Sequence, residues 1–290
     1  ERLLSAIGPL VVLQNLVVWL GLYLVGYGLI LWPLMEGPGD PRLDDALRAS
    51  GSSLFTLGFA APAEAAPTAL VLLAAATGII VIALKIAYLP VLYGQFAVRE
   101  AGVASFASRI GVPPWGPRVL TVHHEQGIEA TLPAYFEEWC GRVAEIGVAH
   151  AHYPTLVYFR ASIPRTSWIA SLVAMLDAAN LLLACSPRTA PQQCRLLLLT
   201  APAGLRRLVE PLRLVRPQAD LCLDRVAFQE AVELMRRAGV MVERDGDHAW
   251  EAFAARRATY APAARALLHL TLAPPAPWLG SPPPDVAGSG

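Results

Sequence analysis

Two long apolar runs dominate the first part of the chain. Residues 9–34 contain no charged side chain, and residues 67–93 contain one, Lys85. A helix of about 20 apolar residues is long enough to cross the hydrocarbon core of a bilayer. The pattern therefore predicts two transmembrane helices, 9–34 and 67–93. Pro90 removes a backbone hydrogen bond near the end of the second run, so we expect it to kink or terminate that helix.

The segment between the two runs has a helical pattern of its own. Asp40 suits the N-cap and Pro41 the first helical position, while Asp44 and Asp45 fall in the first turn, where carboxylates favour the helix dipole. These signals predict a helix over 41–55. At a rise of 1.5 Å per residue it would be about 22 Å long, which is too short to cross a membrane.

The second half of the chain mixes apolar and polar residues at helical spacing. Apolar positions three and four residues apart predict helices over 128–147, 167–185 and 225–239. The helix at 167–185 is nearly as apolar as a span, but Asp177 and Asn180 in its interior favour a buried core helix. We therefore expect an all-α membrane protein.

The same pattern predicts the domain organisation. A transmembrane domain occupies residues 1–97, and a linker broken by proline and glycine occupies 98–122. A mostly helical second domain follows over 123–258. Residues 259–290 are rich in proline, alanine and glycine, and we expect them to form a disordered tail.

Composition and charge support the membrane class. Hydrophobic residues make up 55% of the 290 residues and charged residues 16%, and the mean hydropathy is +0.45. The net charge is zero and the basic residues are dispersed, which excludes a nucleic-acid partner. Arg99, Arg109 and Arg118 follow the second run, so the positive-inside rule places both termini in the cytoplasm. Membrane lipid is the expected partner.

The sequence shows no arrangement typical of an enzyme or a metal protein. The cysteines match neither a zinc ribbon nor a redox pair, and we interpret them as reduced thiols: Cys140, Cys185, Cys194 and Cys222. The histidines lack supporting ligands at a suitable spacing: His123, His124, His150 and His152. No glycine-rich nucleotide loop and no catalytic constellation is found, so we expect neither a cofactor nor an enzymatic activity.

The short helix is followed by the sequence Thr56-Leu57-Gly58-Phe59. A span, a short helix, Thr-x-Gly-aromatic and a second span, in this order, resemble the two-transmembrane potassium channels. The chain also resembles a bacterial group of potassium-channel-like membrane proteins in the sequence "YLPVLY" at 88–93, in "YPTLVYFR" at 153–160 and in Ser167-Trp168.

This resemblance implies an ion channel in the inner membrane of a bacterium, assembled as a homotetramer around a four-fold pore. The short helix would be a re-entrant pore helix whose carbonyl end favours a cation, K⁺ or Na⁺. The second domain would be cytoplasmic, and its ligand is not evident from the sequence. By resemblance the filter comprises Thr56, Leu57, Gly58, Phe59 and Ala60, and the inner-helix hinge and pore comprise Gly78, Ile82, Lys85, Leu89 and Pro90.

The chain departs from the family at Ala60 and Ala61, where the family has Gly and Asp. Left-handed backbone costs a residue with a Cβ roughly 1–2 kcal/mol, a cost that glycine avoids. We therefore expect a shorter, wider or collapsed filter and an altered or reduced selectivity for potassium.

Lys85, the only lysine of the chain, leaves two interpretations open. Its ammonium group either reaches the cytoplasmic headgroups or forms a ring of four charges in the inner pore. Such a ring, together with Ala60, favours an alternative function: a channel-derived membrane scaffold or sensor that does not conduct and acts through its cytoplasmic domain. A plain two-span anchor with a surface loop is a third reading.

Overall fold

The computed structural model describes residues 7–35, 42–60, 62–161, 163–210, 212 and 223–279. Within these ranges the chain forms α-helices and short 3-10 helices and no β-strand, as predicted for the fold class. The chain divides into two compact units, one ending at Gly94 and the other beginning at Gln95. Each unit is described by itself below.

The first unit is built on two long apolar helices. Helix α2 spans Ile7–Leu31 and is followed by the 3-10 helix η1, Trp32–Leu34. Helix α4 spans Ala65–Ile110, and its first part, up to Gly94, belongs to this unit. Both α2 and α4 are long and apolar enough to cross a membrane, and most of their large apolar side chains are exposed. Such a surface is suited to lipid, so the chain has the character of a membrane protein.

A short helix, α3, lies between the two long helices in the sequence and spans Leu43–Leu54. Its Ala46 and Ala49 are buried in one cluster with Leu31 of α2 and Val71 of α4. This confirms the predicted helix over 41–55 from Leu43 onwards. Asp40 and Pro41, which were expected to begin it, lie outside the described residues.

Glycine lets α3 approach its two neighbours closely. A Cβ on Gly28 of α2 would lie 2.6 Å from Leu47 Cδ2, and a Cβ on Gly78 of α4 would lie 1.9 Å from the carbonyl oxygen of Leu54. A side chain at Gly78 would therefore overlap the backbone of α3, and one at Gly28 would displace the Leu47 side chain. Small residues serve the same purpose wherever apolar helices pack at short distance.

Pro90 was expected to kink or terminate the second span, and termination is wrong, because α4 continues through Pro90 to Ile110. A proline removes one hydrogen bond, and well-formed turns on both sides allow an apolar helix to continue past it. The linker expected over 98–122 is likewise wrong. Val103 and Phe106 of α4 belong to the core of the second unit, and the next helix, α5, begins at Gly116.

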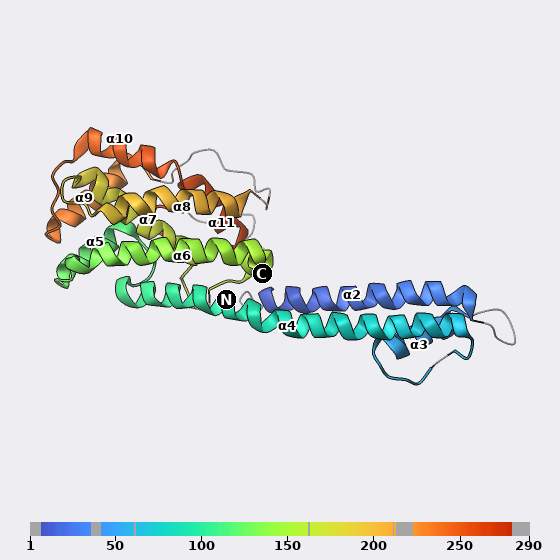
Figure 1. The fold of residues 1–290 in the computed structure, drawn as a ribbon. Helices are drawn as coiled ribbons and strands as arrows, with labels where there is room; N and C mark the ends of the chain where they lie inside the picture. Colours follow the sequence, from blue (N-terminus) through green and yellow to red (C-terminus); the bar gives the residue numbers. More distant parts are fainter. Residues whose placement is uncertain are drawn as a thin grey trace. The chain divides into compact units, whose positions relative to one another are not determined.

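The second unit packs its helices around α7, Trp168–Cys185 (Figure 1). All residues of α7 are buried. This helix is the third one long and apolar enough to cross a membrane, and its burial agrees with the predicted core helix. The other elements are α5 (Gly116–Glu125), η2 (Glu129–Thr131), α6 (Leu132–His152), η3 (Pro154–Tyr158), α8 (Gln192–Val209), α9 (Arg225–Arg237), α10 (Gly246–Arg257) and α11 (Ala261–Leu270).

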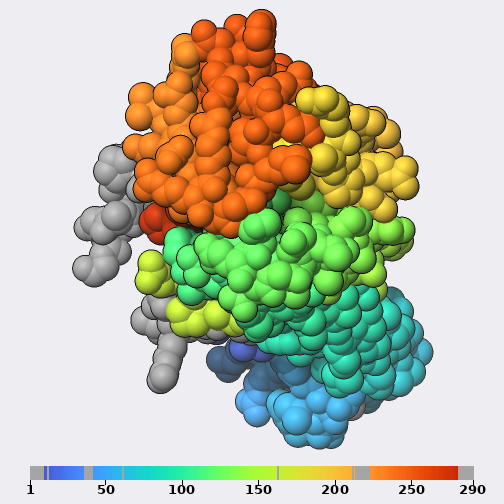
Figure 2. All heavy atoms as spheres, turned by 90° about the vertical axis from the view of Figure 1, so that its left-hand side faces the viewer, coloured from blue at the N-terminus to red at the C-terminus, as the bar shows by residue number. Residues whose placement is uncertain are grey.

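Helices α6 and α9 match the predicted helices at 128–147 and 225–239, whereas α8, α10 and α11 were not predicted from the sequence. The expected disordered tail is wrong over 259–279. Tyr260 is fully buried, α11 follows it, and Trp278 packs edge-on against Trp115 and Phe253. These aromatic contacts stabilise an ordered structure in a segment whose content of proline, alanine and glycine suggested disorder. In Figure 2 the orange side chains of α9 and α10 form a closely packed end of this unit.

Substitution of Gly78 tests the contact between α3 and α4. We expect Gly78→Ala to destabilise the protein by about 1–3 kcal/mol, because the added methyl group would overlap the Leu54 carbonyl. Thermal unfolding of the purified chain in detergent measures the change. Gly94→Ala is the matched control on the same helix, since a Cβ there would meet nothing within 4 Å. Equal melting temperatures for the two variants would contradict the contact.

Candidate functional site

The loop that follows α3 is held by hydrogen bonds back to that helix. The N–H of Thr56 donates to the Ser53 carbonyl at 2.9 Å, and the N–H of Leu57 donates to the Ser52 carbonyl at 2.7 Å. The N–H of Ala60 donates to Ser52 Oγ at 3.0 Å. The first two bonds form the cap that commonly ends a helix at a left-handed residue. The N–H groups of the loop are thus turned towards α3.

The left-handed residue of this cap is Thr56, with φ of +56°. Gly58 is also left-handed, with φ of +73°, which costs a glycine little. A β-branched residue rarely adopts this backbone, and the cost is roughly 1–2 kcal/mol. Ala60, where a left-handed backbone was expected to be too costly, does not have a positive φ. Strain in this loop is therefore located at Thr56, and such strain is often found at functional positions.

The same loop exposes apolar side chains and carbonyl groups. Leu57 is 64% exposed and Phe59 is 60% exposed. Within the described part of the chain, no carbonyl of residues 56–60 accepts a hydrogen bond. The loop also lies at the carbonyl end of α3, where the helix dipole contributes partial negative charge. Unbonded carbonyls at such a point are suitable ligands for a monovalent cation.

Polar contacts between helices fix α3 in place. Ser50 is fully buried, and its hydroxyl donates to the Leu24 carbonyl of α2 at 2.9 Å. Tyr27 of α2 and Thr77 of α4 share a hydrogen bond of 2.8 Å between their hydroxyls. In an apolar environment such bonds hold helices together, because water is not there to replace them. The position of the loop is therefore determined by its supporting helices.

Lys85 has a partner within its own chain. Its Nζ donates to Asn15 Oδ1 of α2 at 2.9 Å and lies 6.0 Å from the ring centroid of Tyr88. Lys85 therefore lies on the α2-facing side of α4. This contact was not anticipated, although Asn15 was a polar residue in an otherwise apolar run and so offered a signal.

The remaining inner-helix residues predicted from the resemblance do not all share one face. Gly78 is buried against Leu54, and Ile82 is half-buried. Leu89 and Pro90 are exposed. The structure thus places Gly78 and Lys85 against other parts of their own unit and leaves Leu89 and Pro90 on its surface.

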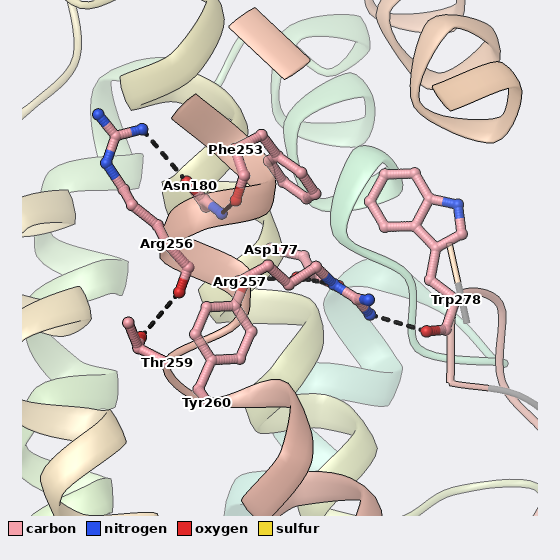
Figure 3. Close-up of polar contacts among 8 residues, drawn as sticks. All are labelled: Asp177, Asn180, Phe253, Arg256, Arg257, Thr259, Tyr260 and Trp278. Atoms are coloured by element: carbon pink, nitrogen blue, oxygen red, sulfur yellow. Dashed lines mark hydrogen bonds and ion pairs between the residues drawn. The ribbon is translucent and has the colours of Figure 1, made fainter. Parts of the chain in front are cut away.

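The second unit contains a buried polar cluster that sequence reasoning did not identify (Figure 3). Arg257 Nε donates to Asp177 Oδ1 at 3.0 Å, and the hydroxyl of Tyr260 donates to the same oxygen at 2.5 Å. A second nitrogen of Arg257 donates to the Trp278 carbonyl at 2.7 Å. Nearby, Asn180 Nδ2 donates to the Phe253 carbonyl at 2.9 Å.

This cluster is enclosed on every side, with Arg257 and Tyr260 fully buried and Asp177 nearly so. Burial raises the pKa of Tyr260 well above its usual value, and the neighbouring Asp177 raises it further, so its hydroxyl keeps the proton that it donates. A cluster closed to solvent cannot receive a substrate. Its role is to fasten α10, α11 and the Trp278 segment to α7.

Within the described residues, the cysteines and histidines do not come together as a reactive site. Cys185 and Cys194 are buried free thiols, and burial raises the pKa of Cys194 to about 12, which keeps it protonated. Cys222 lies outside the described residues. Among the residues that the structure describes, no three histidine, cysteine, aspartate or glutamate side chains come together as metal ligands would.

No family model, curated protein or solved structure matches the chain. The loop after α3 and the surfaces of the second unit are therefore the features of the molecule that bear on its function.

Removal of the Asp177 carboxylate tests the buried cluster. We expect Asp177→Ala to cost about 3–5 kcal/mol of unfolding free energy, because Arg257 would remain charged, buried and without its ion-pair partner. Chemical denaturation of the purified chain measures the loss. Glu233→Ala, which removes an exposed partner of Arg237, is the control and should change stability by less than about 1 kcal/mol. A similar small effect for both would contradict a structural role of the cluster.

Titration of His150 gives a second test. Burial lowers its pKa from 6.5 to about 4, and nearby Arg99 contributes in the same direction. The unfolded chain therefore binds a proton below pH 6.5 that the folded chain does not bind until about pH 4, so stability should fall as the pH decreases through this window. Melting temperatures between pH 7 and pH 4 measure the fall. His150→Phe should reduce the slope, and His248→Phe, which replaces an exposed imidazole, is the control for the substitution itself.

Proposed function

We propose that the protein is an ion channel of the potassium-channel-like type, in which monovalent cations pass along an axis formed by four copies of the chain. The pore would be formed by the first unit, in a bacterial inner membrane with both termini in the cytoplasm. The second unit would be the cytoplasmic domain, and no enzymatic activity is proposed.

The observation that carries this proposal is the loop after α3. Thr56 is held in a left-handed backbone that threonine disfavours, and the N–H groups of Thr56, Leu57 and Ala60 turn towards α3. This arrangement leaves the carbonyl groups of the loop without intrachain partners in the described residues. A strained backbone that frees carbonyls is expected where those carbonyls bind a cation.

Four copies are needed because one loop cannot surround an ion. A dehydrated cation in a filter is coordinated by rings of carbonyl oxygens, and a chain with a single loop contributes one carbonyl to each ring. Rotational symmetry about the pore axis brings identical loops together. The exposed Leu57 and Phe59 side chains would then find apolar partners between copies.

Reduced potassium selectivity is part of the proposal. The N–H of Ala60 is bonded to Ser52 Oγ, so the chain turns back towards α3 directly after Phe59. A loop of this shape offers fewer successive carbonyls than a long filter. We therefore expect a short filter that admits Na⁺ as well as K⁺.

The same turn at Ala60 favours a second candidate, the channel-derived scaffold or sensor that does not conduct. Lys85 does not add to this candidate as a charge ring in the pore, because its ammonium group is bonded to Asn15 of α2 in its own chain. In this case the first unit would assemble and anchor the protein, and the second unit would carry the function by binding a partner.

Reversal potentials in a planar bilayer distinguish the two candidates. The purified chain is inserted under a potassium chloride gradient, and the measurement is repeated with sodium chloride. We expect a cation-directed potential that is similar for both salts, because the proposed filter is short. An absence of current in a preparation of tetrameric mass would support the scaffold, and a stable monomer would contradict both pore-shaped candidates.

Variants at Thr56 connect the current to the loop. Thr56→Gly should stabilise the chain by up to about 1 kcal/mol, because glycine adopts the left-handed backbone without strain, and should alter the ratio of K⁺ to Na⁺ permeability. Gly94→Ala, at a position on α4 with free space, is the control for both readouts. A permeability ratio unchanged in Thr56→Gly would contradict a filter at this loop.

A further inference from the structure

The second unit contains a large cavity between α6 and α8. Its volume is about 810 Å³, within the range of small-molecule sites in proteins. The two helices lie side by side and run in the same direction (Figure 1). The cavity extends along them from Cys140 and Thr200 to His152 and Leu212. The residues from 140 to 152 cover about 18 Å of helix, so the space is elongated.

Small residues leave the space open, and apolar side chains form its walls. Ala144 and Gly147 of α6 face the cavity, as does Ala203 of α8. A Cβ on Gly147 would meet nothing within 4 Å. Two apolar lining residues, Leu199 and Val148, are 75% and 60% exposed. Exposed apolar side chains around a cavity of this size indicate an apolar ligand.

The cavity is also lined by polar side chains, namely Arg207, His150, His152 and Trp168. Its lining contains no aspartate or glutamate within the described residues. His150 and Trp168 are more than nine-tenths buried, yet His150 Nε2 and Trp168 Nε1 have no hydrogen-bond partner. Buried polar atoms normally have hydrogen-bond partners, so a polar group of a ligand is a suitable partner for these two. His150 and Trp168 also line a neighbouring, smaller space beside Arg99 and Glu145.

We propose that this cavity binds a long-chain carboxylic acid, with the alkyl chain along the small residues of α6 and α8 and the carboxylate at Arg207. The guanidinium of Arg207 and the indole N–H of Trp168 are the donors that a carboxylate accepts from. The apolar walls of the cavity suit the alkyl chain of such a molecule. The described lining contains no aspartate or glutamate that would repel its carboxylate. This binding function goes beyond ion conduction and does not require it.

Photo-crosslinking tests the proposal on the full chain in lipid nanodiscs, which avoids competition from detergent. The probe is dodecanoic acid with a diazirine at the end of its alkyl chain, and peptide mass spectrometry locates the label. We expect labelling on α6 near Cys140 and on α8 near Thr200, which lie together at one end of the cavity. Excess unlabelled dodecanoate should reduce this labelling. Labelling spread evenly over α2 and α4 would overturn the proposal, because it would report only partition into lipid.

Matched variants test the position of the alkyl chain. Gly147→Phe fills the cavity from α6, and we expect it to reduce the specific labelling at least tenfold. Gly141→Phe is the control, since Gly141 also has free space around it on the same helix but does not line the cavity. Equal labelling of both variants, with unchanged melting temperatures, would overturn the assignment of the cavity.

A second pair of variants tests the carboxylate end. Arg207→Gln should weaken competition by dodecanoate about tenfold, whereas Arg206→Gln, an adjacent exposed arginine outside the cavity, should not change it. Dodecanol, which has the same chain without the charge, should compete poorly with the probe. Equal competition by dodecanol and dodecanoate would overturn the proposed acid and leave only an apolar site. Because the readout is labelling, these results do not depend on whether the protein conducts ions.

Discussion

The second unit depends on the pairing of one buried carboxylate. Asp177 lies on a helix whose residues are all buried, and a charge in such a position is costly unless it is paired and hydrogen-bonded. Arg257 and Tyr260 supply the donors, and Arg257 also holds the Trp278 carbonyl. A buried ion pair adds little net stability compared with an apolar core, but the loss of one member is strongly destabilising. The pairing therefore selects one arrangement of α7, α10 and α11 among the many that their apolar surfaces would allow.

The first unit is organised differently from the second, because it has no comparable buried ion pair among its described residues. Most of its large apolar side chains are exposed, and small residues make its close helix contacts. Gly28 and Gly78 admit α3 between the long helices, and hydroxyl groups supply the specific bonds. This support allows the loop after α3 to keep Thr56 in an unfavourable backbone. A loop on a flexible segment would relax instead. Rigid surroundings and local strain are thus two aspects of one arrangement, and the proposed ion pathway depends on both.

Local patterns in the sequence predicted the elements that have strong local signals. The long apolar runs indicated α2 and α4, the acidic first turn indicated α3, and the apolar helix with Asp177 inside it indicated a core helix. The failures have physical causes that act over longer distances. Pro90 was expected to kink or end the helix, and α4 continues past it because the adjoining turns maintain the helix. The segment of α11 was expected to be disordered from its composition, because the contacts of Tyr260 and Trp278 are not visible locally. The strain at Thr56 depends on a backbone angle, and the partner of Asp177 lies about eighty residues away.

The separation between Asp177 and Arg257 has a consequence for biosynthesis. The carboxylate leaves the ribosome well before the guanidinium that neutralises it, and a chain is made at about 5–20 residues per second. Asp177 is therefore without Arg257 for several seconds, and the unit stays partly open during that time. During that interval the most apolar helix outside the first unit remains accessible to chaperones and to the membrane. The order of synthesis thus sets a time at which this unit can close, and that time comes only when nearly all of its helices have been made.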